Sequence, residues 1–213
     1  GLIKDNGLTK EKVVNENLIS TTKYYIENKY KKDGFFNTKV TINTVIDTSS
    51  LNHVNMVVKI DKGTKVKIKD IVFEGNKEIK SETLRAAMKD TKRKTLISIK
   101  ASKFIQAKYD DDKEKIIAAY KERGYRDARI VSDSVAYSDE LKAIMIKIKV
   151  EEGNKYRFGN IKFLGNTVYS DEGLLGMLGI KKGDTYNGVL LEKRIADKTK
   201  PDGDDITNLY QNN

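Results

Sequence analysis

The sequence predicts an α+β fold of tandem repeats, each a strand, two helices and two more strands, with both helices packed on one three-stranded sheet. Self-similarity at a fixed spacing is the signature of repeated modules. Three pairs of similar segments keep a spacing of ninety residues: YKKDGF at Tyr30 and YKERGY at Tyr120, VNMVVKIDKG at Val54 and IMIKIKVEEG at Ile144, and IVFEGNKEI at Ile71 and IKFLGNTVY at Ile161. One spacing shared by three pairs favours duplication over chance similarity.

This spacing divides the 213 residues into three parts. We expect residues 1–62 to be the C-terminal part of one module, residues 63–152 a complete module, and residues 153–213 the N-terminal part of a third. Tyr210 stands one period after Tyr120, so in a continuing third module we expect a glycine directly after Asn213, at the position equivalent to Gly124. Successive modules follow each other within a few residues, which predicts a semi-rigid arm.

The first half of the complete module predicts a strand and a short helix. KVKIKDIVFEGN alternates apolar and polar residues on either side of one slip, which a bulge would absorb. Its apolar residues are Val66, Ile68, Ile71 and Phe73. KSETLRAAMK then predicts a helix with Ser81 as its N-cap. The apolar residues at helical spacing are Leu84, Ala87 and Met88.

The second half predicts a longer helix and a hairpin. YDDDKEKIIAAYKERGY places residues 110–112, three aspartates, at a helix entrance, where the helix dipole favours anions, and Gly124 just after its end. The predicted buried stripe is Ile116, Ile117 and Tyr120. RDARIVSDSVAY and LKAIMIKIKV predict two strands with one covered face. The alternating apolar residues are Ile144, Ile146, Ile148 and Val150, matched in the first part by Val54, Met56, Val58 and Ile60.

Composition excludes several kinds of chemistry. The chain is 38% hydrophobic and 34% charged, which suits small modules with thin cores. It has no cysteine, so thiolate metal sites and thiol nucleophiles are excluded, and its single histidine, His53, lies in an expected hairpin turn without companions. DDD at 110–112 and PDGDD at 201–205 lack calcium-loop spacing, and GNTVYSDEGLLG lacks a phosphate-binding fingerprint. We therefore expect no enzyme, no metal and no cofactor.

The order of elements and the repeated motifs resemble POTRA domains, the polypeptide-transport-associated repeats that precede outer-membrane barrels of the BamA type. The motifs are F-x-G-N at Phe73 and Phe163, the helix ending Y-K-x-x-G-[FY], and the closing K-[IV]-x-x-G. The resemblance covers essentially the whole chain. It implies an arm on the periplasmic face of the bacterial outer membrane that receives unfolded outer-membrane protein precursors and docks accessory assembly subunits, while a barrel inserts the product.

Other parents remain open at this point. A two-partner secretion transporter or a translocation-assembly protein would carry similar repeats in front of its barrel. A transmembrane helix before the repeats would instead suggest a cell-division protein. This sequence contains no apolar run of about eighteen residues, so we expect no membrane-spanning segment within it.

The predicted client-binding residues lie on edge strands. An edge strand offers unpaired N–H and C=O groups, to which an extended client adds itself with little demand on its own sequence. The resemblance places the second strand of each module at a sheet edge. The candidate residues are Val40, Thr41, Ile42, Asn43, Ile130, Val131, Ser132, Asp133 and Ser134. The alternative is that these short, partly polar strands are merely edges protected against aggregation.

A basic segment, residues 91–108, is the second candidate contact surface. Its six cations, with no acidic residue between them, are Lys92, Arg93, Lys94, Lys100, Lys103 and Lys108. Apolar residues alternate with them: Leu96, Ile97, Ile99, Phe104 and Ile105. Such a segment suits an anionic membrane surface or an acidic partner. The alternative is that its apolar residues complete the core while the lysines face water.

Nucleic acid is the rival partner from a different class. A formal net charge of +10 and eleven tyrosines motivate it. Single-strand binding would group tyrosines between basic residues on one sheet face. Tyr30, Tyr120 and Tyr210 instead recur at the end of a helix, and most lysines alternate with acidic residues, as on a solvated helix face. We therefore expect no nucleic-acid partner.

Overall fold

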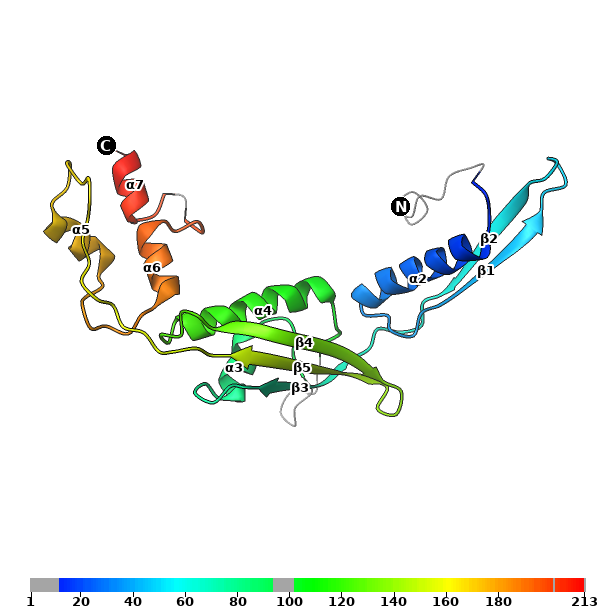
Figure 1. The fold of residues 1–213 in the computed structure, drawn as a ribbon, viewed down its shortest axis with the longest axis horizontal. Coiled ribbons are helices and arrows are strands. Elements are labelled where there is room, and N and C mark those ends of the chain that lie inside the picture. The colour runs from blue at the N-terminus through cyan, green and yellow to red at the C-terminus, as the bar shows by residue number, and fades with distance from the viewer. Residues whose placement is uncertain (1–11, 94–101, 201, 213) are drawn as a thin grey trace. The chain divides into compact units, whose positions relative to one another are not determined.

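A computed structural model describes residues 12–93, 102–200 and 202–212 and confirms the α+β class (Figure 1). The elements are α2 (Glu16–Lys32), β1 (Lys39–Ile46), β2 (Val54–Asp61), β3 (Ile68–Glu74), α3 (Ser81–Ala87), α4 (Gln106–Lys121), β4 (Arg129–Ser138), β5 (Ala143–Glu151), α5 (Asp171–Leu178), α6 (Gly188–Ile195) and α7 (Ile206–Gln211). None of the helices described is long and apolar enough to cross a membrane.

The chain divides into two compact units: residues 1–70, 90–110 and 135–145 form one, and residues 71–89, 111–134 and 146–213 form the other. Each strand of the three-stranded sheet has residues in both units, and its order is β3-β5-β4. The expected strand-helix-helix-strand-strand order is present from β3 to β5. The sheets do not show this order as a repeat. Strands β1 and β2 form a sheet of two strands, and within residues 152–200 the only β-structure is an isolated bridge between Arg157 and Thr185.

The strand predictions for the middle of the chain are confirmed by burial. The four alternating residues of β5 that were predicted to be covered are all buried: Ile144, Ile146, Ile148 and Val150. In β3, Ile68 and Ile71 are buried three positions apart, whereas Ile71 and Phe73 are buried two apart. This break in the alternation is the predicted slip. Leu84 and Met88 are also fully buried, so α3 contributes one face to the same core.

Two predicted helix beginnings are wrong. The N-cap of α3 is Lys80, and the Ser81 hydroxyl instead accepts a hydrogen bond from the Asn76 side chain at 3.0 Å. Helix α4 begins at Gln106, so the three aspartates lie inside the helix and not at its entrance. Asp112 is fully buried there, and its carboxylate accepts the backbone N–H of Lys89 at 2.7 Å. Its contacts with other parts of the fold, rather than the dipole of its own helix, explain its position.

The buried stripe of α4 is narrower than predicted. Ile116 and Tyr120 are fully buried, but Ile117 is only half-buried. Because Ile117 follows directly after a core position, the helix turns it toward the flank of the helix-sheet core, where it lines a hollow described below.

The first part of the chain is a helix beside a long hairpin. Helix α2 is capped by Asn15, whose side chain accepts the N–H of Leu18 at 2.8 Å. Strands β1 and β2 pair antiparallel, with Val40 opposite Ile60. His53 lies in the connection between them, as predicted, with its Nδ1 2.7 Å from the carbonyl oxygen of Leu51.

A buried carboxylate organises the second unit. Glu152, 7% exposed, follows β5 and accepts hydrogen bonds from three successive backbone N–H groups, those of Lys77, Glu78 and Ile79, at 2.8, 2.9 and 3.1 Å. The Tyr120 hydroxyl donates a fourth bond at 3.0 Å. Burial, followed by the bond to Glu152, raises the pKa of Tyr120 above its ordinary range. The end of β5 is thus tied to the loop after β3 and to α4.

Successive parts of the chain are joined by the same backbone hydrogen bond. Val66 donates its N–H to the carbonyl of Gly34 at 3.0 Å, and Tyr156 donates to Gly124 at 2.8 Å. The two donors, Val66 and Tyr156, are ninety residues apart, and so are the two acceptors, Gly34 and Gly124. The side chains around the two bonds differ: Phe36 contacts Phe104 edge-on, with ring centroids 5.7 Å apart, at the first junction.

Candidate functional site

The outer strand β4 carries five of the candidate residues, Ile130 to Ser134. The sheet order confirms that this strand lies at an edge, and no strand among the described residues pairs with its outer side. Residues 131–134 are exposed. The edge therefore presents backbone groups to solvent, as strand addition requires.

The outer strand β1 carries the other candidates, Val40 to Asn43, and is less open. The Val40 side chain is 3% exposed, and its N–H donates to Glu27 of α2 at 3.3 Å. In an antiparallel pair, N–H groups that do not face the partner strand face outward. Helix α2 therefore occupies one outward donor of β1, which leaves β4 as the more accessible edge.

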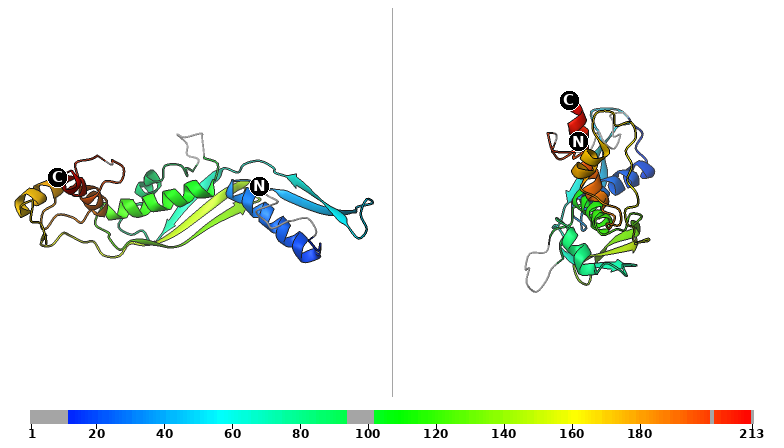
Figure 2. Two further views of the ribbon diagram at one scale, coloured as in Figure 1. Left: turned by 90° about the horizontal axis from the view of Figure 1, so that it is seen from above. Right: turned by 90° about the vertical axis from the view of Figure 1, so that its left-hand side faces the viewer.

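A hollow of about 670 Å³ lies beside β4, between α4 and α6. Its apolar residues are Ile117 and Ala118 from α4, Ile130 from β4 and Val189 from α6. Its charged residues are Lys113, Glu114 and Lys121 from α4, Asp133 from β4 and Glu192 from α6. Helix α4 runs along β4 in both views (Figures 1 and 2). We call this hollow the α4–β4 groove.

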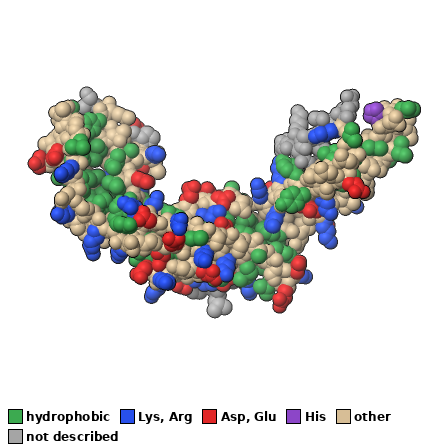
Figure 3. Space-filling view, viewed as in Figure 1, with side chains coloured by type: hydrophobic (Ala, Val, Ile, Leu, Met, Phe, Trp, Pro, Cys, Tyr) green, Lys and Arg blue, Asp and Glu red, His purple; other side chains and the backbone are tan. Residues whose placement is uncertain are grey.

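The charges of the α4–β4 groove have mixed sign. The Lys113 ammonium lies 3.7 Å from the Asp133 carboxylate, which links the helix to the edge strand. In the space-filling view, basic and acidic side chains intermingle over the middle of the chain (Figure 3). An apolar floor between charges of both signs suits a segment that alternates apolar and polar residues better than a polyanion.

The contribution of α6 to this groove was not predicted. The sequence signal was available in NGVLLEKRI, where Asn187 caps the helix by accepting the N–H of Leu190 at 2.9 Å. That signal predicts a helix but not its neighbour. Only the tertiary structure brings Val189 and Glu192 beside α4.

The basic segment is described only in part. Lys94 and Lys100 lie outside the described residues. Arg93 pairs with Asp70 and Lys108 with Asp90, both at 2.7 Å, while the Lys103 side chain is exposed. Lys92 donates its backbone N–H to the Ser102 hydroxyl. Phe104 is buried, as the core interpretation requires, and membrane or partner contact by this segment stays a prediction.

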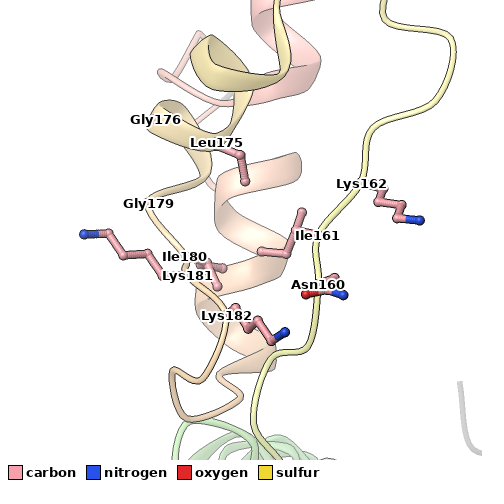
Figure 4. Close-up of a pocket in the computed structure, with 9 residues that line it drawn as sticks. All are labelled: Asn160, Ile161, Lys162, Leu175, Gly176, Gly179, Ile180, Lys181 and Lys182. Carbon is pink, nitrogen blue, oxygen red and sulfur yellow. The ribbon is translucent and has the colours of Figure 1, made fainter.

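A second hollow, of about 680 Å³, lies within residues 160–182. Ile161, Leu175 and Ile180 line it, and the close-up shows Ile161 and Leu175 pointing toward each other across it (Figure 4). Lys162 and Lys181 point away from it in the same view. Asn160 and Lys182 also line this hollow, and among the described residues no group of His, Cys, Asp and Glu could hold a metal ion.

Comparison with known proteins decides the family. The family model for POTRA, described as surface antigen variable number repeat, matches residues 66–153 and 156–200. The chain belongs to the POTRA family. Its POTRA domains are homologous to the POTRA region of the outer-membrane assembly factor BamA. This is a family of non-enzymatic assembly factors, and family membership, rather than any missing catalytic residue, supports the prediction that the chain is not an enzyme.

Three curated relatives give the scale of the similarity. BamA of Neisseria meningitidis serogroup B is 27% identical over 162 residues, which are 76% of this chain and 20% of that protein. BamA of Nitratidesulfovibrio vulgaris is 25% identical over 178 residues, 82% of this chain and 22% of that protein. A putative outer membrane protein assembly factor of Treponema pallidum is 29% identical over 140 residues, which are 63% of this chain and 16% of that protein. The POTRA chain thus spans about a fifth of the length of these relatives.

Solved structures of POTRA domains are also similar. The crystal structure of Haemophilus influenzae BamA POTRA3-5 matches with a TM-score of 0.47 and 20% identity, covering 82% of this chain and 66% of that one. POTRA1-3 of the periplasmic domain of Omp85 from Anabaena matches with a TM-score of 0.42 and 11% identity, covering 90% and 73%.

Proposed function

We propose that this chain is part of the periplasmic POTRA arm of a BamA-like assembly factor and that it binds unfolded outer-membrane protein precursors by strand addition at β4. In this proposal the arm consists of tandem β-α-α-β-β modules, lies at the periplasmic face of the outer membrane and docks accessory assembly subunits, while a barrel outside this sequence carries out membrane insertion. The observation that carries the proposal is the open edge of β4 beside the α4–β4 groove.

The chemistry of the groove suits such clients. Strands of outer-membrane barrels alternate apolar and polar residues. A strand added beside β4 places alternate side chains on the face that α4 covers, where Ile117, Ile130 and Val189 are available. Its other side chains then face the uncovered side of the sheet. Backbone hydrogen bonds supply affinity without reading the sequence, which is what a receiver of many clients needs.

Membrane and partner contact through the basic segment is a further part of the proposal. The Lys103 side chain is exposed, and Arg93 and Lys108 are already paired with Asp70 and Asp90. We expect binding to vesicles with anionic lipid to fall when Lys103 is replaced by Gln. Unchanged binding to anionic and neutral vesicles would support the purely structural interpretation of this segment.

A proline pair at the edge of β4 tests strand addition. Backbone N–H groups of neighbouring residues in a strand point to opposite sides, so one of Ser132→Pro and Asp133→Pro removes a donor facing β5 and the other removes one facing outward. We expect the first kind to destabilise the sheet and the second to keep the fold while abolishing binding of a peptide of about ten residues that alternates Leu and Thr. Because the chain has no tryptophan for fluorescence, binding of the peptide is followed by NMR.

A modified peptide supplies the control. N-methylation of alternate residues in the same peptide removes its backbone donors on one edge but keeps every side chain. Strand addition predicts that methylation on one edge abolishes binding and that methylation on the other edge does not. Two results would show that side chains and not backbone groups hold the client. One is equal binding of the two methylated peptides, and the other is unchanged peptide binding by both proline variants.

A further inference from the structure

Two lysines share one aromatic ring directly after β2, at the base of the hairpin that lies beside α2 (Figure 1). The ammonium groups of Lys62 and Lys65 lie 5.9 and 5.2 Å from the centroid of the Phe35 ring. Lys62 also lies 5.4 Å from the centroid of Tyr30, whose ring meets Phe35 edge-on at 6.0 Å. We call these four residues the lysine–aromatic patch. The rings help to fix the two ammonium groups, because a ring face attracts cations.

The positive charge of the lysine–aromatic patch is not balanced by a neighbouring carboxylate. Within residues 12–93, 102–200 and 202–212, neither Lys62 nor Lys65 forms an ion pair. Lys62 is exposed and Lys65 is half-buried, so solvent reaches both. Two like charges on one ring repel each other, and each ammonium has three N–H donors to offer. An anion that contacts both ammonium groups would reduce this repulsion.

The equivalent positions ninety residues later carry charges of opposite sign. Lys62 and Lys65 correspond to Glu152 and Lys155. Glu152 places a carboxylate beside the helix-end tyrosine, Tyr120, whose hydroxyl it accepts at 3.0 Å. The chain thus supplies its own anion beside one helix-end tyrosine and a cation beside the other. At the lysine–aromatic patch, a carboxylate would come from another molecule.

Further lysines continue the patch toward β3. Val66 and Ile68 are buried whereas Lys67 and Lys69 are exposed, so the alternation places Lys65, Lys67 and Lys69 on one side of the chain. Residues two apart in an extended chain are about 7 Å apart on the same side. Neither Lys67 nor Lys69 has an ion-pair partner in the part of the chain that the structure describes. An extended segment with an acidic residue at every second position matches this spacing.

Acidic side chains next to the patch favour a narrow partner over a broad anionic surface. Asp61 directly precedes Lys62, Asp33 lies two residues before Phe35, and both aspartates are exposed. A bilayer surface would approach these carboxylates together with the lysines, and like charges across a contact disfavour it. A single extended segment can contact the lysines alone.

We propose that the lysine–aromatic patch binds an extended acidic segment of a partner protein. One carboxylate lies between the ammonium groups of Lys62 and Lys65, and the next ones along the segment pair with Lys67 and Lys69. The inference rests on the proposed docking of accessory assembly subunits and names the chemistry of one such partner. It does not depend on strand addition at β4.

A peptide of ten residues that alternates Glu and Ser is the probe, and NMR of the whole chain follows its binding at about physiological salt. Lys62→Gln together with Lys65→Gln should weaken binding about tenfold, because two exposed ion pairs are lost. Lys23→Gln together with Lys59→Gln is the matched control. Lys23 in α2 and Lys59 in β2 are exposed and lie over no ring among the described residues. This control removes the same charge and should weaken binding less than about threefold.

A single charge reversal tests the pair on the ring. Lys62→Glu places an internal carboxylate near Lys65, so it should weaken binding more than Lys62→Gln does. Lys59→Glu makes the same change of charge away from the rings and should have a smaller effect. Equal losses in the patch variants and their controls would show that only net charge attracts the peptide, which would overturn the proposal.

Vesicles of anionic lipid and the alternating Leu-Thr peptide are tested on the same proteins. Patch variants that lose vesicle binding but keep Glu-Ser peptide binding would identify a membrane as the partner and overturn the proposal. Absence of Glu-Ser binding with intact Leu-Thr binding would contradict the acidic partner alone. Absence of Leu-Thr binding, with Glu-Ser binding that still depends on Lys62 and Lys65, would contradict strand addition alone.

Discussion

Glu152 and Lys62 lie ninety residues apart, at equivalent positions of the sequence period, but make opposite contacts. Glu152 is buried, receives three backbone N–H groups and is bonded by the Tyr120 hydroxyl. Lys62 is exposed, and its ammonium lies over the rings of Tyr30 and Phe35, 5.4 and 5.9 Å from their centroids. The tyrosine at the helix end is the same in both repeats. The charge beside it has changed sign.

The difference shows what the position requires. A buried carboxylate is stable only where enough donors converge on it. In the middle repeat the loop after β3 supplies them. Lys62 is exposed to solvent, where a cation needs no converging donors, and its ammonium lies on aromatic rings. The helix-end tyrosine is thus common to both positions, whereas burial of the neighbouring side chain differs.

The largest expected effect is at Glu152. Glu152→Ala leaves three loop N–H groups and the Tyr120 hydroxyl without their acceptor in a buried site, so we expect a loss of about 3 kcal/mol. Lys62→Ala removes only an exposed cation–π contact and should cost less than about 1 kcal/mol. The chain has two units, so the two stability losses are measured locally, by amide hydrogen exchange in urea at each position. Similar losses at the two positions would contradict the comparison.

The loop glycines sharpen the comparison by separating strain from overlap. Both Gly75→Ala and Gly165→Ala place a side chain at positive φ, which costs about 1–2 kcal/mol. Only at Gly75 does the new Cβ also overlap a strand, so β5 must shift and the loss should be larger than at Gly165, about 2–3 kcal/mol. Equal losses in this chain would mean that the space beside Gly165 is not open.

Much of the middle repeat could be predicted because its signals are local. The strict alternation in β5 reflects one covered face, and the slip in β3 is visible as two apolar residues three positions apart. The errors arose where a residue serves another part of the fold. Asp112 resembles a helix-entrance aspartate, but its carboxylate accepts the Lys89 N–H across the fold.

The candidate site shows the same limit. That β4 lies at an edge followed from the resemblance, and the sheet order agrees. The blocking of Val40 by Glu27 and the contribution of Val189 to the groove depend on packing between helices and strands that no local pattern encodes. The role of Glu152 was hidden because the preceding repeat has Lys62 in its place.

A smaller effect is expected at the two helix-end tyrosines. Tyr120→Phe removes the hydroxyl bonded to Glu152 while the three backbone donors remain, so we expect a loss of about 1 kcal/mol. Tyr30→Phe keeps the ring under Lys62, and no hydrogen bond of the Tyr30 hydroxyl is found in the described part of the chain. Its stability should change by less than about 0.5 kcal/mol. Thermal unfolding of the two variants against the parent chain distinguishes a hydrogen-bonding tyrosine from a packing one.

The smallest effect concerns the junctions between repeats, one of which is ionic and the other aromatic. At the second junction, hydrogen bonds from Arg126 and then Tyr156 hold the pKa of Asp127 below its ordinary value of 3.8. Asn37 stands at the corresponding position of the first junction and donates to the Tyr137 hydroxyl at 3.2 Å. Asp127 therefore contributes stability above its unfolded pKa, and this contribution is lost as the pH falls through the lower folded pKa. The first junction has no such dependence at this position.

An NMR titration of the Asp127 carboxyl measures this difference at its source. Because the Arg126 bond is the largest cause of the shift, Arg126→Gln should raise the Asp127 pKa more than Tyr156→Phe does. Asp127→Asn should remove the acid-dependent loss at the second junction and make it behave like the first, where Asn37 is already neutral. A reversed order of the two pKa changes would mean that the tyrosine, and not the guanidinium 4.6 Å from its ring centroid, holds the carboxylate at the junction.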